Sequence, residues 1–265
     1  IVVTAGTITD DIDIALGSGS QISGTVTQDS GGAPIEGIHV EVWSANGQLL
    51  AWAGTDASGD YTINETFAAG LYFVKTWNDL GYINQLYDGV PCAFCVATDG
   101  TPLVISADEA TYEIDFFLTI GGLISGTVTD DTTHANLENI GVHVHDLAGN
   151  WIQSTGTDVD GNYLMKVGLP SGSYFTRTSN GQGYVNEVYS DVPCIGVCEF
   201  ESATPIGVTA GSTTTGIDFA LIQGAKISGT VTDAISGLPI DDSDVVIVTA
   251  SGRVAAGARV RSDGT

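Results

Sequence analysis

Apolar and polar residues alternate with a period of two along much of this chain. In the segment 38–43 every second residue is aliphatic, and the segment 114–118 alternates in the same way. Alternation of this kind places one set of side chains on a buried face and the other on a solvated face, which is typical of a half-buried β-strand. We find no long segment with helical periodicity and caps. The pattern therefore predicts an all-β protein.

Clusters of Gly, Asn, Asp, Ser and Pro interrupt the alternating segments at short intervals. Examples lie at 44–47, 56–60 and 171–173. Such residues favour turns, because they adopt left-handed backbone or hydrogen-bond to their own backbone. Within about 100 residues these turns separate about seven short strands, which is typical of a two-sheet sandwich of immunoglobulin or prealbumin type.

The chain contains internal repeats. The hexapeptide Ile-Ser-Gly-Thr-Val-Thr begins at Ile22, Ile124 and Ile227, so its copies lie 102 and 103 residues apart. A second marker, Ile-Asp followed by Phe or Ile and then by Leu, precedes each hexapeptide in the same register. Its aspartates are Asp13, Asp115 and Asp218. Two markers with one period indicate tandem copies of a single structural unit.

The repeat period predicts four regions. Residues 21–121 form a first full repeat and residues 123–223 a second. Residues 1–16 match the end of a repeat in pattern, and residues 226–265 match the beginning of one. We call residues 21–121 the first repeat, residues 123–223 the second repeat and residues 226–265 the third repeat. Residues 1–16 are called the N-terminal segment. The simplest interpretation is a window on a longer array of closely coupled domains.

An alternative interpretation concerns the N-terminal segment. Its apolar residues Ile12, Ile14 and Leu16 could dock as a donated strand on the incomplete third repeat of another copy and so build a fibre.

The charge balance limits the partners. The chain has 32 Asp and Glu against 7 Lys and Arg, a formal net charge of −25, while 43% of its residues are hydrophobic. The hydrophobic content favours folded domains over an acidic disordered tail. Without clustered basic residues, binding to nucleic acid or to an anionic membrane surface is disfavoured. No apolar run approaches the length of a membrane span.

The repeats resemble the bacterial carboxypeptidase regulatory-like family over nearly the whole chain. The hexapeptide is followed by Ala-Pro-Ile at 33–35 and by Leu-Pro-Ile at 238–240, and the match continues with Thr-Asp-Ala-Ser-Gly-Asp-Tyr at 55–61 and Ala-Gly-Leu-Tyr-Phe-Val at 69–74. The resemblance implies tandem seven-stranded prealbumin-like sandwiches in large secreted or cell-surface proteins, often beside enzymes. It implies no ligand.

Each full repeat has one close cysteine pair after a Val-Pro. The pairs are Cys92 with Cys95 and Cys194 with Cys198. One pair in each repeat predicts two local disulfides formed in an oxidising compartment. A redox motif would use a helix N-terminus to lower the thiol pKa, and none is predicted here. A shared zinc site would have to join two domains.

Acidic loops recur at 56–60 and 158–162. Their carboxylates Asp56, Asp60, Asp158 and Asp160 are candidate calcium ligands, and calcium is the one cofactor that the sequence leaves open. The loops lack the twelve-residue pattern and closing Glu of an EF-hand. The favoured interpretation is a hairpin turn with Gly59 or Gly161 at positive φ and an Asp that caps it.

Two further groups of residues are candidate sites. His143 and His145 form a His-x-His pair that could bind a metal, although exposed strand histidines are the favoured interpretation. Four tryptophans could stack on carbohydrate, although core or inter-domain packing is the more ordinary role. They are Trp43, Trp52, Trp77 and Trp151.

No recurring Ser, His and Asp set or glycine-rich phosphate loop indicates catalysis. We therefore expect a secreted or cell-surface, non-catalytic structural region of a filament, stalk or adhesin, whose partners are copies of itself or neighbouring repeats. The alternative is a polysaccharide-binding or spacer module of a larger secreted enzyme.

Overall fold

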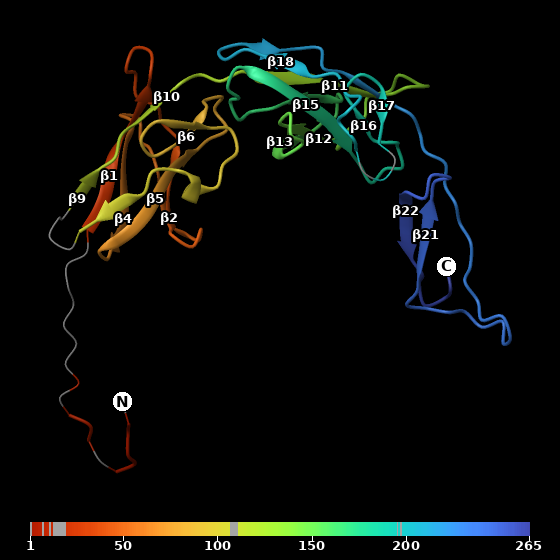
Figure 1. Ribbon diagram of the computed structural model, residues 1–265, viewed down its shortest axis with the longest axis horizontal. Helices are drawn as coiled ribbons and strands as arrows, with labels where there is room; N and C mark the ends of the chain where they lie inside the picture. Colours follow the sequence, from red (N-terminus) through yellow and green to blue (C-terminus); the bar gives the residue numbers. More distant parts are fainter. Residues whose placement is uncertain are drawn as a thin grey trace. The chain divides into compact units, whose positions relative to one another are not determined.

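A computed structural model of the chain describes residues 2–6, 8–10, 12, 20–106, 111–194, 196 and 198–265 (Figure 1). The chain divides into two compact units. The first comprises Ile1–Trp77, Gln85–Val90 and Val96–Phe117, and the second comprises the remaining residues. Within the described ranges the only helix is a single 3₁₀ turn, Ala97–Asp99. The all-β prediction is confirmed.

The first repeat consists of two sheets. The smaller has the order β10-β1-β4, with β9 also paired to β1, and the larger has the order β3-β2-β5-β6-β7, with β8 also paired to β5. The strands of the smaller sheet are β1 (Ser20–Gln28), β4 (Asp60–Phe67), β9 (Thr111–Glu113) and β10 (Phe116–Leu118). Those of the larger are β2 (His39–Ser44), β3 (Leu49–Gly54), β5 (Gly70–Trp77), β6 (Asn84–Leu86), β7 (Val90–Cys92) and β8 (Leu103–Ile105).

The second repeat has the same arrangement. Its smaller sheet has the order β14-β11-β19 with β20 on β11, and its larger sheet has the order β13-β12-β15-β16-β17 with β18 on β15. The smaller sheet contains β11 (Leu123–Asp130), β14 (Asn162–Leu164), β19 (Thr213–Thr214) and β20 (Phe219–Leu221). The larger contains β12 (Gly141–His145), β13 (Trp151–Gly156), β15 (Gly172–Ser179), β16 (Glu187–Val188), β17 (Val192–Pro193) and β18 (Ile206–Val208).

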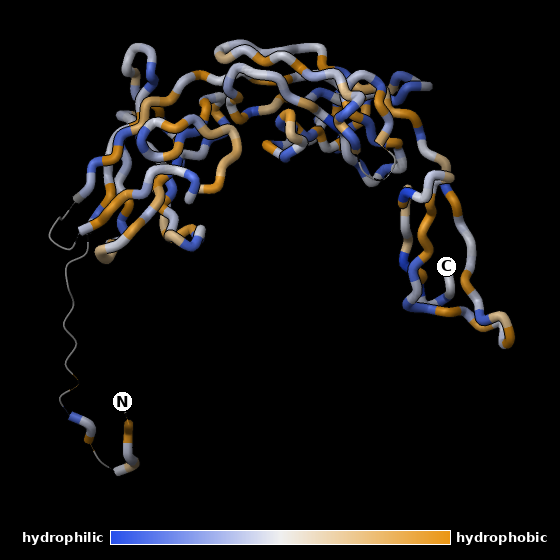
Figure 2. The backbone as a smooth tube through the Cα atoms, in the orientation of Figure 1, coloured by the Kyte–Doolittle hydropathy of each residue, from blue (hydrophilic) through white to orange (hydrophobic). Residues whose placement is uncertain are grey.

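The alternating positions form the cores. In β2 the side chains of Val40 and Val42 are fully buried, whereas the alternate residues His39, Glu41 and Trp43 are partly exposed. Phe116 in the first repeat and Phe219 in the second are 1% and 2% exposed at matching positions. Each such side chain stabilises the fold by about 1.5–3 kcal/mol through burial. Figure 2 shows the resulting alternation of apolar and polar stretches along the strands.

The two sequence markers meet in the structure. The backbone N–H and the hydroxyl of Thr25 both donate to Oδ1 of Asp115, at 2.8 and 2.9 Å. Thr127 donates to Asp218 in the same way, at 2.8 and 3.0 Å. In each full repeat the aspartate of the Ile-Asp-Phe segment therefore accepts two hydrogen bonds from the hexapeptide strand. This contact explains why the two markers recur together. Asp13 lies outside the described residues.

Gly24 lies beside this clasp for a steric reason. A Cβ atom on Gly24 would overlap the carbonyl of Ile114, the residue before Asp115. The same carbonyl accepts a hydrogen bond of 2.7 Å from the hydroxyl of Tyr61. Burial, with the nearby Asp115 carboxylate, raises the pKa of the Tyr61 phenol, so the hydroxyl stays a donor. The glycine and the tyrosine of the repeat pattern thus serve one strand junction.

A β-bulge recurs at one place in all three repeats. The register between neighbouring strands shifts at Val42/Trp43, at Val144/His145 and at Ile247/Val248. Bulges redirect the side chain that follows them. In the third repeat the bulge lies in the hairpin of β21 (Asp244–Val248) and β22 (Val254–Arg259). Outside this hairpin, the third repeat exposes apolar residues at positions that are buried in the two full repeats. Ile227, for example, is 76% exposed.

Candidate functional site

The cysteine pairs are joined within their own loops. Cys92 is bonded to Cys95 and Cys194 to Cys198, with Cα atoms 5.6 and 4.6 Å apart. All four sulfurs are in disulfides, so the structure holds no thiolate that could bind zinc. Residues 195 and 197 of the second loop lie outside the described residues. Each pair closes a very short loop, so it restrains the loop more than the domain.

The acidic loops are turns, but they are not hairpins. Oδ1 of Asp56 accepts backbone hydrogen bonds from Ser58 and Asp60, at 2.8 and 3.1 Å. Gly59 has a φ of 78°, and a Cβ atom there would meet the Val26 carbonyl. The turn joins β3 in the larger sheet to β4 in the smaller sheet. The hairpin prediction was wrong because local turn signals do not reveal which sheet the next strand joins.

The second acidic loop has the same construction. Oδ1 of Asp158 accepts backbone hydrogen bonds from Asp160 and Asn162, at 3.0 and 2.8 Å. Across the part of the chain that the structure describes, no three His, Cys, Asp or Glu side chains gather as a metal site. The aspartates Asp56 and Asp158 already cap turns, and calcium binding stays a prediction.

The histidine pair is packed, not exposed. His145 is 6% exposed, and its Nδ1 lies 3.0 Å from the Gly149 carbonyl oxygen. The Arg177 Nε donates to His145 Nε2 at 3.2 Å, while Phe200 lies over the imidazole with ring centroids 4.8 Å apart. The expectation of exposed strand histidines was wrong, because a ring from the segment after the second disulfide covers this face.

His143 lies one position earlier on the same face of β12. Its Nε2 is 2.7 Å from the Ser179 hydroxyl, whereas its Nδ1 is buried without a partner. Burial, followed by the charges of Arg177 and His145, lowers the His143 pKa to about 4. Both imidazoles are therefore neutral at neutral pH and serve the packing of this face. Neither has a third metal ligand within the described residues.

The matching outward face of the first repeat is aromatic and open. Trp52 stacks on His39 with ring centroids 4.7 Å apart and planes 10° from parallel. Trp77 lies on the other strand neighbour, 5.4 Å from the His39 ring. Trp52 is 56% exposed and Trp77 is 43% exposed. These two residues are not in the core, because the period of two places them outward, and the alternative of inter-domain packing stays a prediction.

A paired charge lies beside the rings. The ammonium of Lys75 is 3.5 Å from Glu41 and 4.9 Å from the centroid of Trp43. The Trp43 indole N–H donates to the same Glu41 carboxylate at 3.0 Å. The cation–π contact and the hydrogen bond therefore hold Trp43 on this face. The charges of Lys75 and Glu41 balance one another.

A carboxylate hollow in the second repeat was missed in the sequence. Asp131, Glu187 and Asp191 line a cavity of about 300 Å³ together with apolar residues. Burial, with the charges of Asp191 and Asp131, raises the Glu187 pKa to about 7. The matching residue of the first repeat is Gln85, whose amide donates to the Phe117 carbonyl at 2.6 Å. The difference between Gln85 and Glu187 at matching positions is the sequence signal that could have indicated this cavity.

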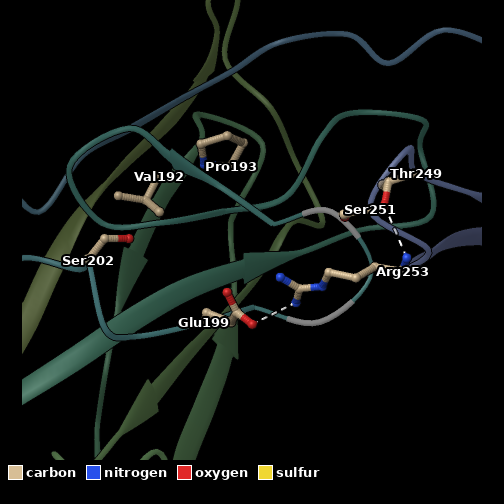
Figure 3. Close-up of a pocket in the computed structure, with 7 residues that line it drawn as sticks. All are labelled: Val192, Pro193, Glu199, Ser202, Thr249, Ser251 and Arg253. Atoms are coloured by element: carbon tan, nitrogen blue, oxygen red, sulfur yellow. Dashed lines mark hydrogen bonds and ion pairs between the residues drawn. The ribbon is translucent and has the colours of Figure 1, made fainter.

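A second, open hollow of about 270 Å³ contains one ion pair (Figure 3). The Arg253 guanidinium points to the Glu199 carboxylate at 2.9 Å. Both side chains are about half exposed, so the pair contributes roughly 0–1 kcal/mol. The other lining residues are Val192, Pro193, Ser202, Thr249 and Ser251. The lining set contains hydroxyl groups but no histidine that could activate one.

Two known proteins are similar to part of this chain. No family model matches. Colossin-A of Dictyostelium discoideum is 26% identical over 175 residues, and serine-aspartate repeat-containing protein F of Staphylococcus epidermidis is 27% identical over 168 residues. Each match covers 59% of this chain but only 2% and 10% of the two relatives.

Solved structures with partial similarity include a TIE protein and two pilins. The Bacillus anthracis TIE protein matches 93% of this chain and 42% of its own, with a TM-score of 0.31 and 14% identity. The match to a streptococcal ancillary pilin covers 79% of this chain and 63% of the pilin chain, with a TM-score of 0.35 and 14% identity. The match to the shaft pilin spaA of Lactobacillus rhamnosus GG covers 79% of this chain and 100% of the pilin chain. Its TM-score is 0.34 and its sequence identity is 12%. Scores this low carry no argument about function, so the fold class rests on the strand order described above.

Proposed function

We propose that this chain is a non-catalytic architectural region of a secreted or cell-surface protein, in which tandem sandwiches form a stalk, an adhesin shaft or a filament. The observation that carries the proposal is the identical construction of two successive repeats. Both have the same sheet order, the same Thr–Asp clasp and one loop disulfide. Tandem domains of one type have stabilities that are roughly additive, which suits a mechanical rod.

The two disulfides support an extracellular location. Disulfides persist in oxidising compartments, and both cysteine pairs are bonded. No helix of the described residues is long and apolar enough to cross a membrane. The staphylococcal relative is named as a repeat-containing protein, which supports the repeat architecture. Membership of the carboxypeptidase regulatory-like family stays a prediction.

Single-molecule force spectroscopy of the chain, held at its two ends, tests the architectural role. We expect two main unfolding events of similar contour length, because each full repeat releases about 100 residues, or roughly 300–350 Å of chain. Both events should resist force, because the terminal strands of each repeat pair in parallel with its first strand. Extension without such events would contradict the proposal.

Electron microscopy of the native secreted material distinguishes a filament from a stalk. Continuous fibres made of separate chains would support self-assembly, and isolated rods would support a stalk. The donated-strand prediction belongs to the first outcome. Ile12 is described and 47% exposed, whereas Ile14 and Leu16 lie outside the described residues. Strand donation therefore stays a prediction.

A further inference from the structure

We propose that the outer face of β3-β2-β5 in the first repeat is a binding surface for a neutral polysaccharide, whose sugar rings stack on exposed indoles. We call this surface the aromatic platform and define it as Trp52, His39, Trp77 and Trp43 with the flanking pair Glu41 and Lys75. The proposal goes beyond the architectural role and does not depend on it.

The backbone arranges the rings side by side. His39 is paired with Trp77 across β2 and β5, and with Gly54 across β2 and β3. Because Gly54 has no side chain, the Trp52 ring can lean over His39, where it stacks almost parallel at 4.7 Å. One face of the Trp52 ring is used by His39, and the indole still has 56% of its surface exposed. Three rings thus follow one another across three strands.

The fold does not require these rings. The second repeat has the same strands in the same register, but Gly141, Ser154 and Ser179 replace His39, Trp52 and Trp77. Exposed apolar surface carries a solubility cost, so contiguous patches mark sites of interaction. The neighbouring positions Leu50 and Leu71 are also exposed, at 43% and 52%. The platform is therefore an addition to the shared sandwich.

Charge selects the class of ligand. Glu41 and Lys75 neutralise one another beside the rings, so the platform offers no net charge to an ionic partner. The whole chain carries a formal net charge of −25, which repels anionic polysaccharides at low ionic strength. A neutral sugar chain presents flat faces rich in C–H groups to the rings, and its hydroxyl groups can hydrogen-bond to the partly exposed carboxylate and ammonium that lie among the rings.

The position on the sheet favours a sugar over a peptide. Extended peptides commonly add to a sheet edge through their backbone, and proline-rich peptides dock in aromatic-lined grooves. The platform lies on the outer face of the sheet, on side chains of β2, β3 and β5, so a ligand that stacks on its rings approaches the face and not the free edge of β3. Flat rings with polar groups among them match the amphipathic faces of a pyranose.

Affinity electrophoresis of the full chain tests the proposal. Native gels would contain soluble neutral polysaccharides, namely a β-glucan, a xylan, a glucomannan, glycol chitin and a starch, each compared with a plain gel. We expect retardation by at least one of them. The double variant Trp52→Ser and Trp77→Ser should weaken that binding by about tenfold or more, because each stacked ring is lost. The second repeat already carries serine at both positions, so the sandwich tolerates this change.

The matched control is Phe117→Ser. Phe117 is 53% exposed in β10 of the other sheet of the same repeat, so its loss removes an exposed aromatic ring without touching the platform. The control should retain full retardation, and circular dichroism should show all variants folded. The proposal fails if no neutral polysaccharide retards the chain, or if the double variant binds as well as the control. Preferential binding of poly-L-proline or of pectin would also overturn it.

Discussion

The outer faces of the larger sheets differ between the two full repeats, although the strands beneath them correspond. In the first repeat the face consists of open indoles around His39. In the second, Phe200 closes over Phe175 and His145, and Arg177 hydrogen-bonds to the covered imidazole. Core positions of a sandwich are constrained by packing, whereas outward positions are free to change. The comparison indicates that one repeat uses its outer face for stability and the other leaves it available.

The largest expected effect concerns what the repeats share. Phe116→Ala and Phe219→Ala should each lower the free energy of unfolding of their own repeat by about 3–5 kcal/mol, because each leaves a cavity in a matching core. Hydrogen exchange read by mass spectrometry would follow each repeat separately. Losses that differ by more than about 2 kcal/mol would show that the two cores are not equivalent.

The next effect sharpens the difference between the faces. Phe175→Ala should cost about 3 kcal/mol, because Phe175 is 8% exposed and stacks on Phe200 at 5.2 Å. Trp52→Ser should cost less than about 1 kcal/mol, because an exposed ring contributes little to the fold. Chemical denaturation of the two variants measures both values. A large loss for Trp52→Ser would mean that the platform is structural.

The third prediction uses the hollow of the second repeat. The Glu187 pKa is raised from 4.5 to about 7, so the folded state binds a proton that the unfolded state releases. The stabilisation of the folded state by protonated Glu187 is fully present below pH 4.5 and is lost as the pH rises to about 7. Glu187→Gln, the residue type at Gln85, should stabilise the second repeat at pH 8 by on the order of 2 kcal/mol.

The control for this prediction is His143→Gln. The His143 pKa is lowered from 6.5 to about 4, so its neutral form supports the fold above pH 6.5, and that support is lost as the pH falls towards 4. The two groups therefore oppose each other between pH 4.5 and 6.5, and only single variants separate them. Thermal melts from pH 4 to 8 provide the measurement. An unchanged pH profile in Glu187→Gln would contradict the assignment.

The smallest effect concerns the disulfides. Removing the first pair with Cys92→Ser and Cys95→Ser should cost about 1–2 kcal/mol, since very short loops restrict the unfolded chain little. The matching change at Cys194 and Cys198 should cost more, because the loop leads to Phe200, which covers the face of β12 and β15. Equal losses in denaturant titrations would show that the second disulfide does not position Phe200.

The platform was only partly predictable. The tryptophans were recognised as candidates, and the period of two places Trp43 outward. The stacking of Trp52 on His39 depends on the register that sets Gly54 opposite His39, which alternation along one strand does not reveal. The covering of His145 depends on Phe200, a residue far along the chain whose ring lies 4.8 Å from the imidazole. Neither feature has a local sequence signal.

The sequence by itself determined the repeat unit, the all-β class and the core positions, because side-chain alternation and turn chemistry are local properties with a fixed period. It also placed Asp115 and Asp218 at the same period as the hexapeptide, whereas their hydrogen bonds to it are seen only in the structure. Only the tertiary structure decided that the acidic turns cross between sheets, that Glu187 is buried beside Asp131 and Asp191, and that one outer face is open while the other is covered. These outcomes depend on which strands become neighbours, and that choice is made by packing across the whole repeat.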